Sequence, residues 1–216
     1  ECWVLHPNDA WHGFGDIEDG YCMLDPIKVS ISTPGIGPDG LGEMGVPASI
    51  LSAYLTANGI IPEKTTDFTV LMLFSIGITK GKWGTLIDTL LKFKEDYDNN
   101  TSLEEVLPDV VKAAPQRYSG MGLRDLCKEM FAAMKELKTT EFMSEGFAVL
   151  PHPDMSPSSA YEQLVLDNVE KVDLDGVAER TLATGIVPYP PGIPLIMPGE
   201  NAGPADGPAL GYLKAL

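Results

Sequence analysis

The sequence predicts an α/β fold that passes into an α+β fold, and three patterns support this prediction. Strand-like runs alternate with amphipathic helical runs over the first part of the chain, whereas helical patterns dominate the second part. A run dense in proline and glycine follows near the C-terminus. Alternating elements are typical of α/β folds, and segregated elements are typical of α+β folds. We therefore expect two domains, which cover residues 1–100 and 101–216.

The first predicted strand lies within residues 21–33. Ile27, Val29 and Ile31 alternate with more polar residues there, and this period of two is typical of a half-buried strand. The strand should therefore place its apolar side chains on one face. Prolines and glycines at residues 34–42 indicate that a loop follows.

Two helices are predicted in the first domain. The first covers residues 47–58, because Pro47 suits a first turn and Gly59 suits the C′ position. The second covers residues 81–98, where apolar residues recur at the spacing of one helical face. These apolar residues are Trp83, Leu86, Ile87, Leu90 and Leu91.

Residues 59–78, with the sequence GIIPEKTTDFTVLMLFSIGI, contain two strand-like apolar runs. The polar residues 63–67 separate these runs. The second run, residues 68–78, is nearly all apolar, so we expect a central strand that is covered on both faces. On this pattern alone, Glu63 is an exposed carboxylate in the turn between two strands.

The second half of the chain begins with a predicted helix start. Ser102 and Glu105 match the capping-box pattern, in which two side chains satisfy backbone N–H groups reciprocally. Further on, Ser156 and Pro157 suit the N-cap and N1 positions, and another helix is expected over residues 174–185. One predicted helix has an apolar face formed by Leu123, Leu126, Met130, Phe131 and Met134.

The proline-rich run PYPPGIPLIMPGE occupies residues 188–200. It is too dense in proline for a helix or for the middle of a sheet. A flexible linker carries fewer apolar residues than this run does. The apolar residues are Tyr189, Ile193, Leu195, Ile196 and Met197. We therefore expect residues 187–199 to form a rigid, buried connection that packs against a neighbouring element.

The composition limits the classes of function. Because the formal net charge is −16, binding to nucleic acid or to an anionic membrane surface is disfavoured, whereas a cationic ligand is compatible. No run approaches the roughly 18 apolar residues that indicate a membrane-spanning helix. Cys2, Cys22 and Cys127 are widely spaced and form no CxxC pair, which favours reduced thiols in a cytoplasmic protein.

Two short motifs suggest other chemistry only weakly. His6, Asp9 and His12 would share one face of a helix and could bind a metal there. Pro7 disfavours that helix, however, and no further His or Cys ligand is evident. We expect these residues to be polar loop positions and expect no metal site. The run ITKGKWGT lacks the spacing of a phosphate-binding loop, because tryptophan follows Lys82.

Five segments of the chain together resemble bacterial ornithine/lysine/arginine decarboxylases. They are WHGFGDIEDGYCMLDPIKVSISTPG, GVPASILSAYL, GIIPEKTTDF, LFSIGITKGKWGTL and ATGIVPYPPGIPLIMPGE, and they occur in the order found in that family. Members are pyridoxal-phosphate enzymes of the aspartate-aminotransferase fold type. The resemblance implies the C-terminal part of such an enzyme, truncated at both ends. It implies part of an aminotransferase-like small domain at residues 1–100 and a mostly helical α+β C-terminal domain at residues 101–216.

The resemblance also implies that the catalytic and cofactor-binding residues lie outside this chain. In the family, the lysine that binds pyridoxal phosphate follows a Ser-x-His pair upstream, and His6, His12 and His152 precede no such lysine here. We therefore expect the cofactor to bind to an upstream domain, and the segment alone to be inactive. The expected partners are that cofactor domain, a basic amino-acid substrate and further copies of the chain in a homo-oligomer.

For Glu63, the resemblance implies substrate binding. The glutamate of the EKT motif, which is Glu63 here, would pair with the distal cation of arginine, lysine or ornithine. The implied function is a segment of an enzyme that converts one of these to a polyamine precursor and CO₂, and the segment would contribute substrate recognition and subunit packing. One alternative is a non-catalytic binding or assembly module with the same small-domain fold. Another is a metal-dependent hydrolase that uses His6, Asp9 and His12.

Overall fold

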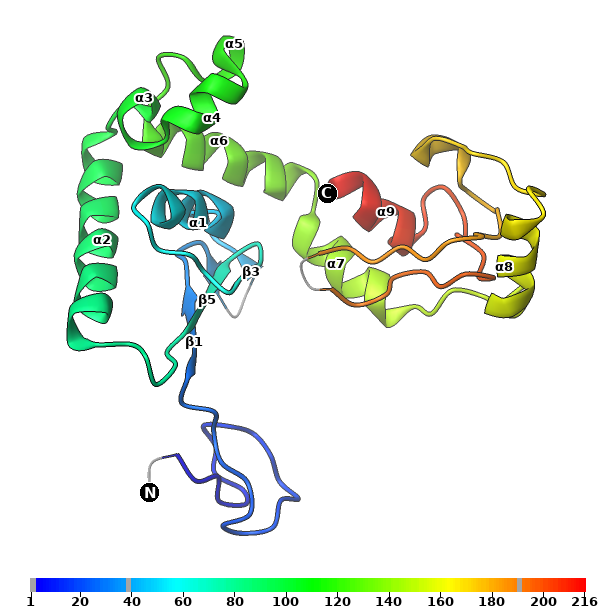
Figure 1. Cartoon of the computed structure of the whole chain (residues 1–216), viewed down its shortest axis with the longest axis horizontal. Helices are drawn as coiled ribbons and strands as arrows, with labels where there is room; N and C mark the ends of the chain where they lie inside the picture. Colours follow the sequence, from blue (N-terminus) through cyan, green and yellow to red (C-terminus); the bar gives the residue numbers. More distant parts are fainter. Residues whose placement is uncertain (1–2, 38–39, 190–191) are drawn as a thin grey trace. The chain divides into compact units, whose positions relative to one another are not determined.

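The computed structural model describes residues 3–37, 40–189 and 192–216. The chain forms two compact units, Glu1–Cys127 and Lys128–Leu216, here called unit 1 and unit 2 (Figure 1). The division falls inside helix α6 (Leu123–Glu136). The domain boundary predicted after residue 100 stays a prediction, because a division into compact units does not show where one domain of a family ends and the next begins. Among the described residues, no helix has both the length and the apolar character needed to cross a membrane.

The described part of unit 1 contains short strands in two antiparallel sheets. The strands are β1 (Lys28–Ser32), β2 (Ile36–Gly37), β3 (Gly40–Leu41), β4 (Lys64–Thr65) and β5 (Thr69–Leu73). The larger sheet has the order β1-β5-β4, so β5 is the central strand, as predicted. The predicted coverage of both its faces is wrong. Val70 and Met72 are buried, whereas on the other face Thr69 and Leu71 are half-buried and Leu73 is exposed.

The helices of unit 1 are α1 (Ala48–Ala57), α2 (Lys80–Asn99), α3 (Leu103–Val106), α4 (Pro108–Ala113) and α5 (Pro115–Tyr118), followed by the start of α6. Helix α1 ends as predicted, with Gly59 at the C′ position and a φ of +76° that favours glycine. The N–H of Gly59 donates to the Thr56 carbonyl at 3.0 Å. The N–H of Ile60 donates to the Leu55 carbonyl at 2.9 Å, and the two bonds form a Schellman motif.

The core of unit 1 lies between the larger sheet and helices α1 and α2, and residues of α3, α4 and α6 add to it. The Tyr54 ring meets the Phe93 ring edge-on, with 5.1 Å between the centroids. The Tyr54 hydroxyl donates to Asp96 at 2.6 Å. Burial and this hydrogen bond raise the pKa of Tyr54, so the phenol stays neutral. These contacts fix α1 against α2.

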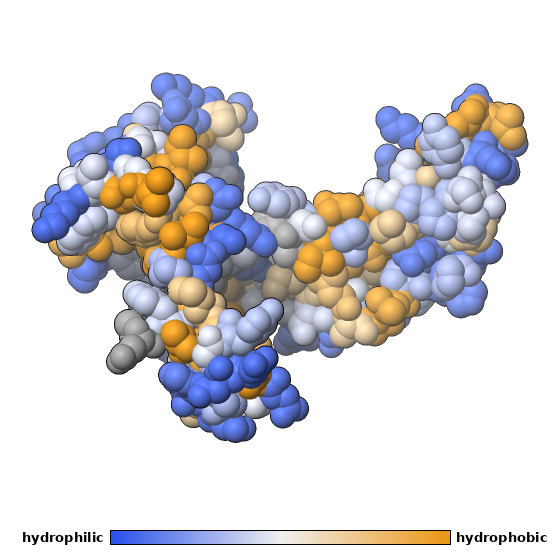
Figure 2. Space-filling model, turned by 60° about the horizontal axis from the view of Figure 1, so that its bottom comes forward, coloured by the Kyte–Doolittle hydropathy of each residue, from blue (hydrophilic) through white to orange (hydrophobic). Residues whose placement is uncertain are grey.

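Helix α2 extends one residue beyond the predicted range of 81–98 at each end, and only part of its predicted apolar face is buried. Leu86 and Phe93 face the core, whereas Trp83, Ile87 and Leu91 are 48%, 45% and 62% exposed. The buried stripe is rotated toward Phe93, because α1 covers that side of the helix. Hydrophobic side chains also lie at the surface elsewhere, as the orange atoms in Figure 2 show.

The junction between α2 and α3 contains the predicted helix cap, with a different partner. Ser102 is the N-cap of α3, and its Oγ accepts from the Glu104 N–H at 3.2 Å. The carboxylate of Glu104, not that of Glu105, bonds back to the Ser102 hydroxyl. Glu104 also accepts the Gly120 N–H at 2.8 Å, and these bonds lower the pKa of Glu104. The predicted partner of Ser102, Glu105, is therefore wrong. Glu104 takes its place, and a hydrogen bond from the distant Gly120 holds the Glu104 carboxylate there.

Unit 2 contains α7 (Thr139–Ala148), α8 (Pro157–Val165), the 3₁₀ turn η1 (Leu174–Gly176) and α9 (Pro208–Ala215). Helix α8 begins as predicted. The Ser156 Oγ accepts from the Ser159 N–H at 3.2 Å, and Pro157 occupies N1. Helices α7 and α9 pack side by side, with the Phe147 and Tyr212 ring centroids 5.7 Å apart (Figure 1).

The helix predicted over residues 174–185 is wrong, because only η1 forms there. The backbone of this stretch bonds instead to the segment near Glu200. The Leu182 N–H donates to the Glu200 carbonyl at 2.9 Å, and the Ala202 N–H donates to the Arg180 carbonyl at 2.9 Å. The backbone N–H and carbonyl groups that a helix would have paired locally therefore form long-range hydrogen bonds instead.

The prediction for residues 187–199 is right in part. Leu195 and Ile196 are buried in the core of unit 2, and an isolated bridge pairs Ile196 with Ile186. Three other apolar residues, Tyr189, Ile193 and Met197, are exposed. Pro190 and Pro191 lie outside the described residues. Leu195 and Ile196 therefore pack as the prediction requires, whereas Tyr189, Ile193 and Met197 do not.

Candidate functional site

Glu63 lies in the segment between the end of helix α1 and the start of the β4–β5 hairpin. The first apolar run, Gly59 to Pro62, is not a strand, because it completes the end of α1. The polar residues that follow form strand β4 instead. The Glu63 N–H donates to the Leu71 carbonyl at 2.9 Å, so the residue is tied to the central strand directly before β4.

The turn of the hairpin lies further along the chain than Glu63. The Thr66 N–H donates to the Thr69 carbonyl at 2.9 Å, and the hydroxyls of these two residues are 2.6 Å apart. The Thr69 N–H also donates to Thr66 Oγ1 at 3.0 Å. The interpretation of Glu63 as a turn residue is therefore wrong, whereas its predicted exposure is confirmed.

Strand β4 also contacts helix α1 through a side-chain hydrogen bond. Thr65 Oγ1 donates to Ser52 Oγ at 2.9 Å, and both residues are half-buried. Sequence reasoning missed Ser52 altogether. No motif spacing could have found the pair, because it forms only when α1 packs on the hairpin.

A cavity of about 340 Å³ lies beside Glu63. Its walls are mainly apolar and include Met72, Trp83 and Leu86, while Lys82 is a charged member of the lining. Within residues 3–37, 40–189 and 192–216, no side chain pairs with the Glu63 carboxylate. An ionised carboxylate with open acceptor positions can take a charge-assisted hydrogen bond from a cationic ligand. Trp83 and Lys82 belong to the run that the sequence identified only as a helix start.

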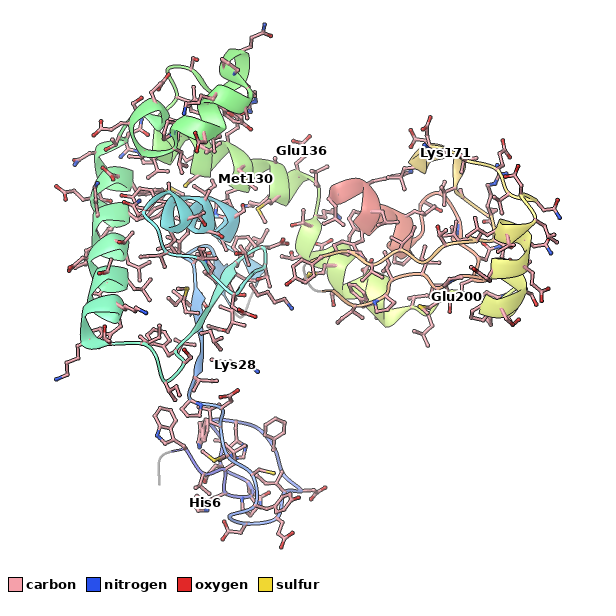
Figure 3. The ribbon with its side chains drawn as sticks, viewed as in Figure 1. His6, Lys28, Met130, Glu136, Lys171 and Glu200 are labelled. Atoms are coloured by element: carbon pink, nitrogen blue, oxygen red, sulfur yellow. The ribbon has the colours of Figure 1, made fainter. Side chains whose placement is uncertain are left out.

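The two histidines of the possible metal motif have other partners. His6 lies in the N-terminal loop of unit 1 (Figure 3). Its Nδ1 lies 2.5 Å from Asp19 Oδ1, and Asp19 raises the pKa of His6. His12 Nε2 donates to the His6 carbonyl at 2.9 Å, and His12 Nδ1 accepts the Phe14 N–H at 3.0 Å. Among the described residues, no group of three or more His, Cys, Asp or Glu side chains could hold a metal ion.

A covalently bound pyridoxal phosphate needs a lysine that can form a Schiff base. A lysine that attacks as a neutral amine is typically desolvated in an apolar pocket or placed next to another cation. In the part of the chain that the structure describes, no lysine is buried. These residues therefore do not fit a Schiff-base site.

An exposed carboxylate that pairs with no side chain in the described part of the chain, next to an apolar cavity, defines a candidate site for a cationic ligand with an apolar stem. The sequence model described as Orn/Lys/Arg decarboxylase, major domain, matches residues 1–82. The model described as Orn/Lys/Arg decarboxylase, C-terminal domain, matches residues 140–216. The chain belongs to the Orn/Lys/Arg decarboxylase family.

Individual relatives agree with this assignment. The chain is 48% identical to the biodegradative arginine decarboxylase of Escherichia coli, over 100% of this chain and 29% of the relative. It is 49% identical to a lysine decarboxylase of Pseudomonas aeruginosa, over 98% of this chain and 28% of the relative. The solved structure of the E. coli constitutive lysine decarboxylase matches with a TM-score of 0.88 and 36% identity, and the match covers 100% of this chain and 30% of that one. The chain thus spans less than a third of the length of these relatives.

Proposed function

We propose that this chain is a segment of a pyridoxal-phosphate-dependent decarboxylase of basic amino acids, in which it contributes substrate recognition and subunit packing. The whole enzyme would convert arginine, lysine or ornithine to a polyamine precursor and CO₂. Similarity to proteins named arginine and lysine decarboxylases supports this reaction. The observation that carries the proposal is the Glu63 carboxylate, which lies beside an apolar cavity and pairs with no side chain of the described residues.

The proposed role of Glu63 follows from what the three substrates share, which is a cation at the end of an alkyl stem. The carboxylate accepts hydrogen bonds from this ammonium or guanidinium group. Met72 and Trp83 line the same cavity and can pack against the alkyl stem of the substrate. Glu63 therefore selects and orients the substrate and takes no part in proton transfer.

The proposed cofactor site lies outside this chain, in an upstream domain. Pyridoxal phosphate supplies an electron sink for the loss of CO₂ when it is bound there. For the fold, we propose that residues 1–100 are part of an aminotransferase-like small domain. Residues 101–216 would form the C-terminal α+β domain of the family. The match of the major-domain model to residues 1–82 is compatible with this division.

The proposed partners are the upstream cofactor domain and further copies of the chain in a cytoplasmic homo-oligomer. Trp83, Ile87 and Leu91 form an exposed apolar row along α2. Apolar surface of this kind is typical of an interface, because contiguous apolar patches are rarely left in water. The row therefore supports packing against a further part of the enzyme.

The experiment that tests the proposed function uses the full-length protein. Release of CO₂ and formation of the amine are measured with arginine, lysine and ornithine in turn. We expect turnover of at least one of the three, and none from the isolated 216-residue chain, whose residues do not fit the cofactor. If the full-length protein decarboxylates none of them, the non-catalytic binding or assembly module becomes the better explanation.

A further inference from the structure

The strand next to Glu63 is short and lies at the edge of its sheet. β4 has only two paired positions, Lys64 and Thr65. Short elements with few hydrogen bonds open locally at low cost. A binding group, in contrast, must be held within about 0.5 Å of its productive position. The backbone pairing of β4 with β5 is therefore too short to hold the Glu63 carboxylate in position by itself.

The hydrogen bond between Thr65 and Ser52 supplies a second support. It joins the edge strand to α1, in which the neighbours Leu51 and Leu55 are buried in the core. Thr65 lies two residues after Glu63, whose own N–H is tied to the central strand. The backbone between these residues is therefore held against the sheet at one end and against the helix at the other.

The turn at Thr66 and Thr69 does not serve the same purpose. Its hydrogen bonds join residues of the hairpin to each other, so they set the shape of the turn. The Thr65 hydroxyl instead fixes the hairpin relative to α1. The two sets of contacts can therefore be tested separately.

We propose that Thr65 and Ser52 are positioning residues for Glu63. Their hydroxyl–hydroxyl hydrogen bond holds the segment so that the Glu63 carboxylate meets the distal cation of the substrate. Neither residue touches that cation. This inference rests on the proposed substrate-binding role of Glu63.

The variants needed for the test should fold. Thr65 and Ser52 both line an open cavity of about 690 Å³ between α1 and the α3–α4 segment. Water can therefore hydrogen-bond to the Ser52 hydroxyl when the Thr65 hydroxyl is removed. Thr65→Val keeps the shape of the side chain and deletes only its hydroxyl, and Thr65→Ser keeps the hydroxyl.

The test measures kcat and KM of the full-length enzyme for its preferred basic amino acid, with neutral norleucine as a weak competitor or substrate. We expect Thr65→Val to lower kcat/KM for the cationic substrate by about tenfold, mostly through KM, because small misplacements of binding groups are costly. The kinetic constants measured with norleucine should not change. Thr65→Ser should restore the natural values. Ser52→Ala should lower kcat/KM by the same factor as Thr65→Val. The double variant should lower it little further, because both changes remove the same hydrogen bond.

Thr101→Val is the matched control, because Thr101 Oγ1 also donates a part-buried hydrogen bond of 2.9 Å, to Asp96. It should leave selectivity unchanged. The inference is overturned if Glu63→Gln lowers kcat/KM for the cationic substrate but Thr65→Val changes it by less than twofold. It is also overturned if Thr65→Val lowers the melting temperature and reduces kcat/KM for the cationic substrate and for norleucine equally. If Glu63→Gln itself has no effect, the role of Glu63 in the proposed function fails instead.

Discussion

Gly211 in helix α9 lies directly against the ring of Phe142 in helix α7. A Cβ atom at residue 211 would stand 2.7 Å from Cδ1 of Phe142, well inside a normal van der Waals contact. On the facing helix, a Cβ at Gly146 would meet the Tyr212 Cβ at 3.4 Å. Glycines on both helices thus allow α7 and α9 to approach closely, and unit 2 is built around this contact.

Gly211→Ala is therefore expected to destabilise unit 2 by about 1–3 kcal/mol, the usual cost of overpacking a well-packed contact. Amide hydrogen exchange of α7 and α9 in the full-length protein measures this loss. Gly84→Ala is the control, because Gly84 also lies in a helix but has no atom within 4 Å of its added Cβ. This control should be neutral or stabilising by up to ~1 kcal/mol, since alanine favours helix. Equal effects of the two changes would contradict the packing argument.

Glu63→Gln in the full-length enzyme should preserve folding and cofactor absorbance. We expect kcat/KM for the cationic substrate to fall by the equivalent of about 2–5 kcal/mol, because the cation of the bound substrate loses its charged partner. Steady-state kinetics on arginine, lysine and ornithine measure the effect. Glu105→Gln, at another exposed glutamate of unit 1, serves as the control. If kcat/KM stays within about threefold for all three substrates, less than 1 kcal/mol, Glu63 does not bind the cation.

Asp154 predicts a pH dependence in unit 2. Hydrogen bonds from Thr181, Asn201 and His152 lower the pKa of Asp154 from its ordinary value of 3.8. The unfolded state therefore binds the proton more readily than the folded state. This stabilisation is fully present above the ordinary pKa and is lost as the pH falls through the lowered folded value.

Asp154→Asn should therefore reduce the stability of unit 2 at neutral pH. The difference between the natural protein and the variant should shrink as the pH falls below about 3.8. Urea unfolding at a series of pH values measures this difference. Asp206→Asn, at an exposed carboxylate of the same unit, should show no such trend. A stability difference that does not change with pH would exclude the carboxylate hydrogen bonds as its source.

The sequence determined the elements whose signals are local. Gly59 stopped α1 because a left-handed residue closes the helix end, and Ser156 with Pro157 started α8 because both suit its first turn. The apolar period predicted the helix α2 for the same reason, since it depends on neighbouring turns of one helix, but it did not predict which side is buried. The substrate-binding role of Glu63 stays a prediction that comes from a resemblance of motifs, because its residue type and spacing alone suggested only an exposed turn.

Tertiary structure decided everything that depends on partners distant in sequence. Residues 174–185 pair with the segment around Glu200 instead of forming a helix, because long-range hydrogen bonds compete with local ones for the same backbone groups. The position of α1 over the hairpin decided that Ser52 meets Thr65. The sequence therefore determined where the chain bends and which family it resembles, whereas packing determined which hydroxyl holds the strand beside Glu63.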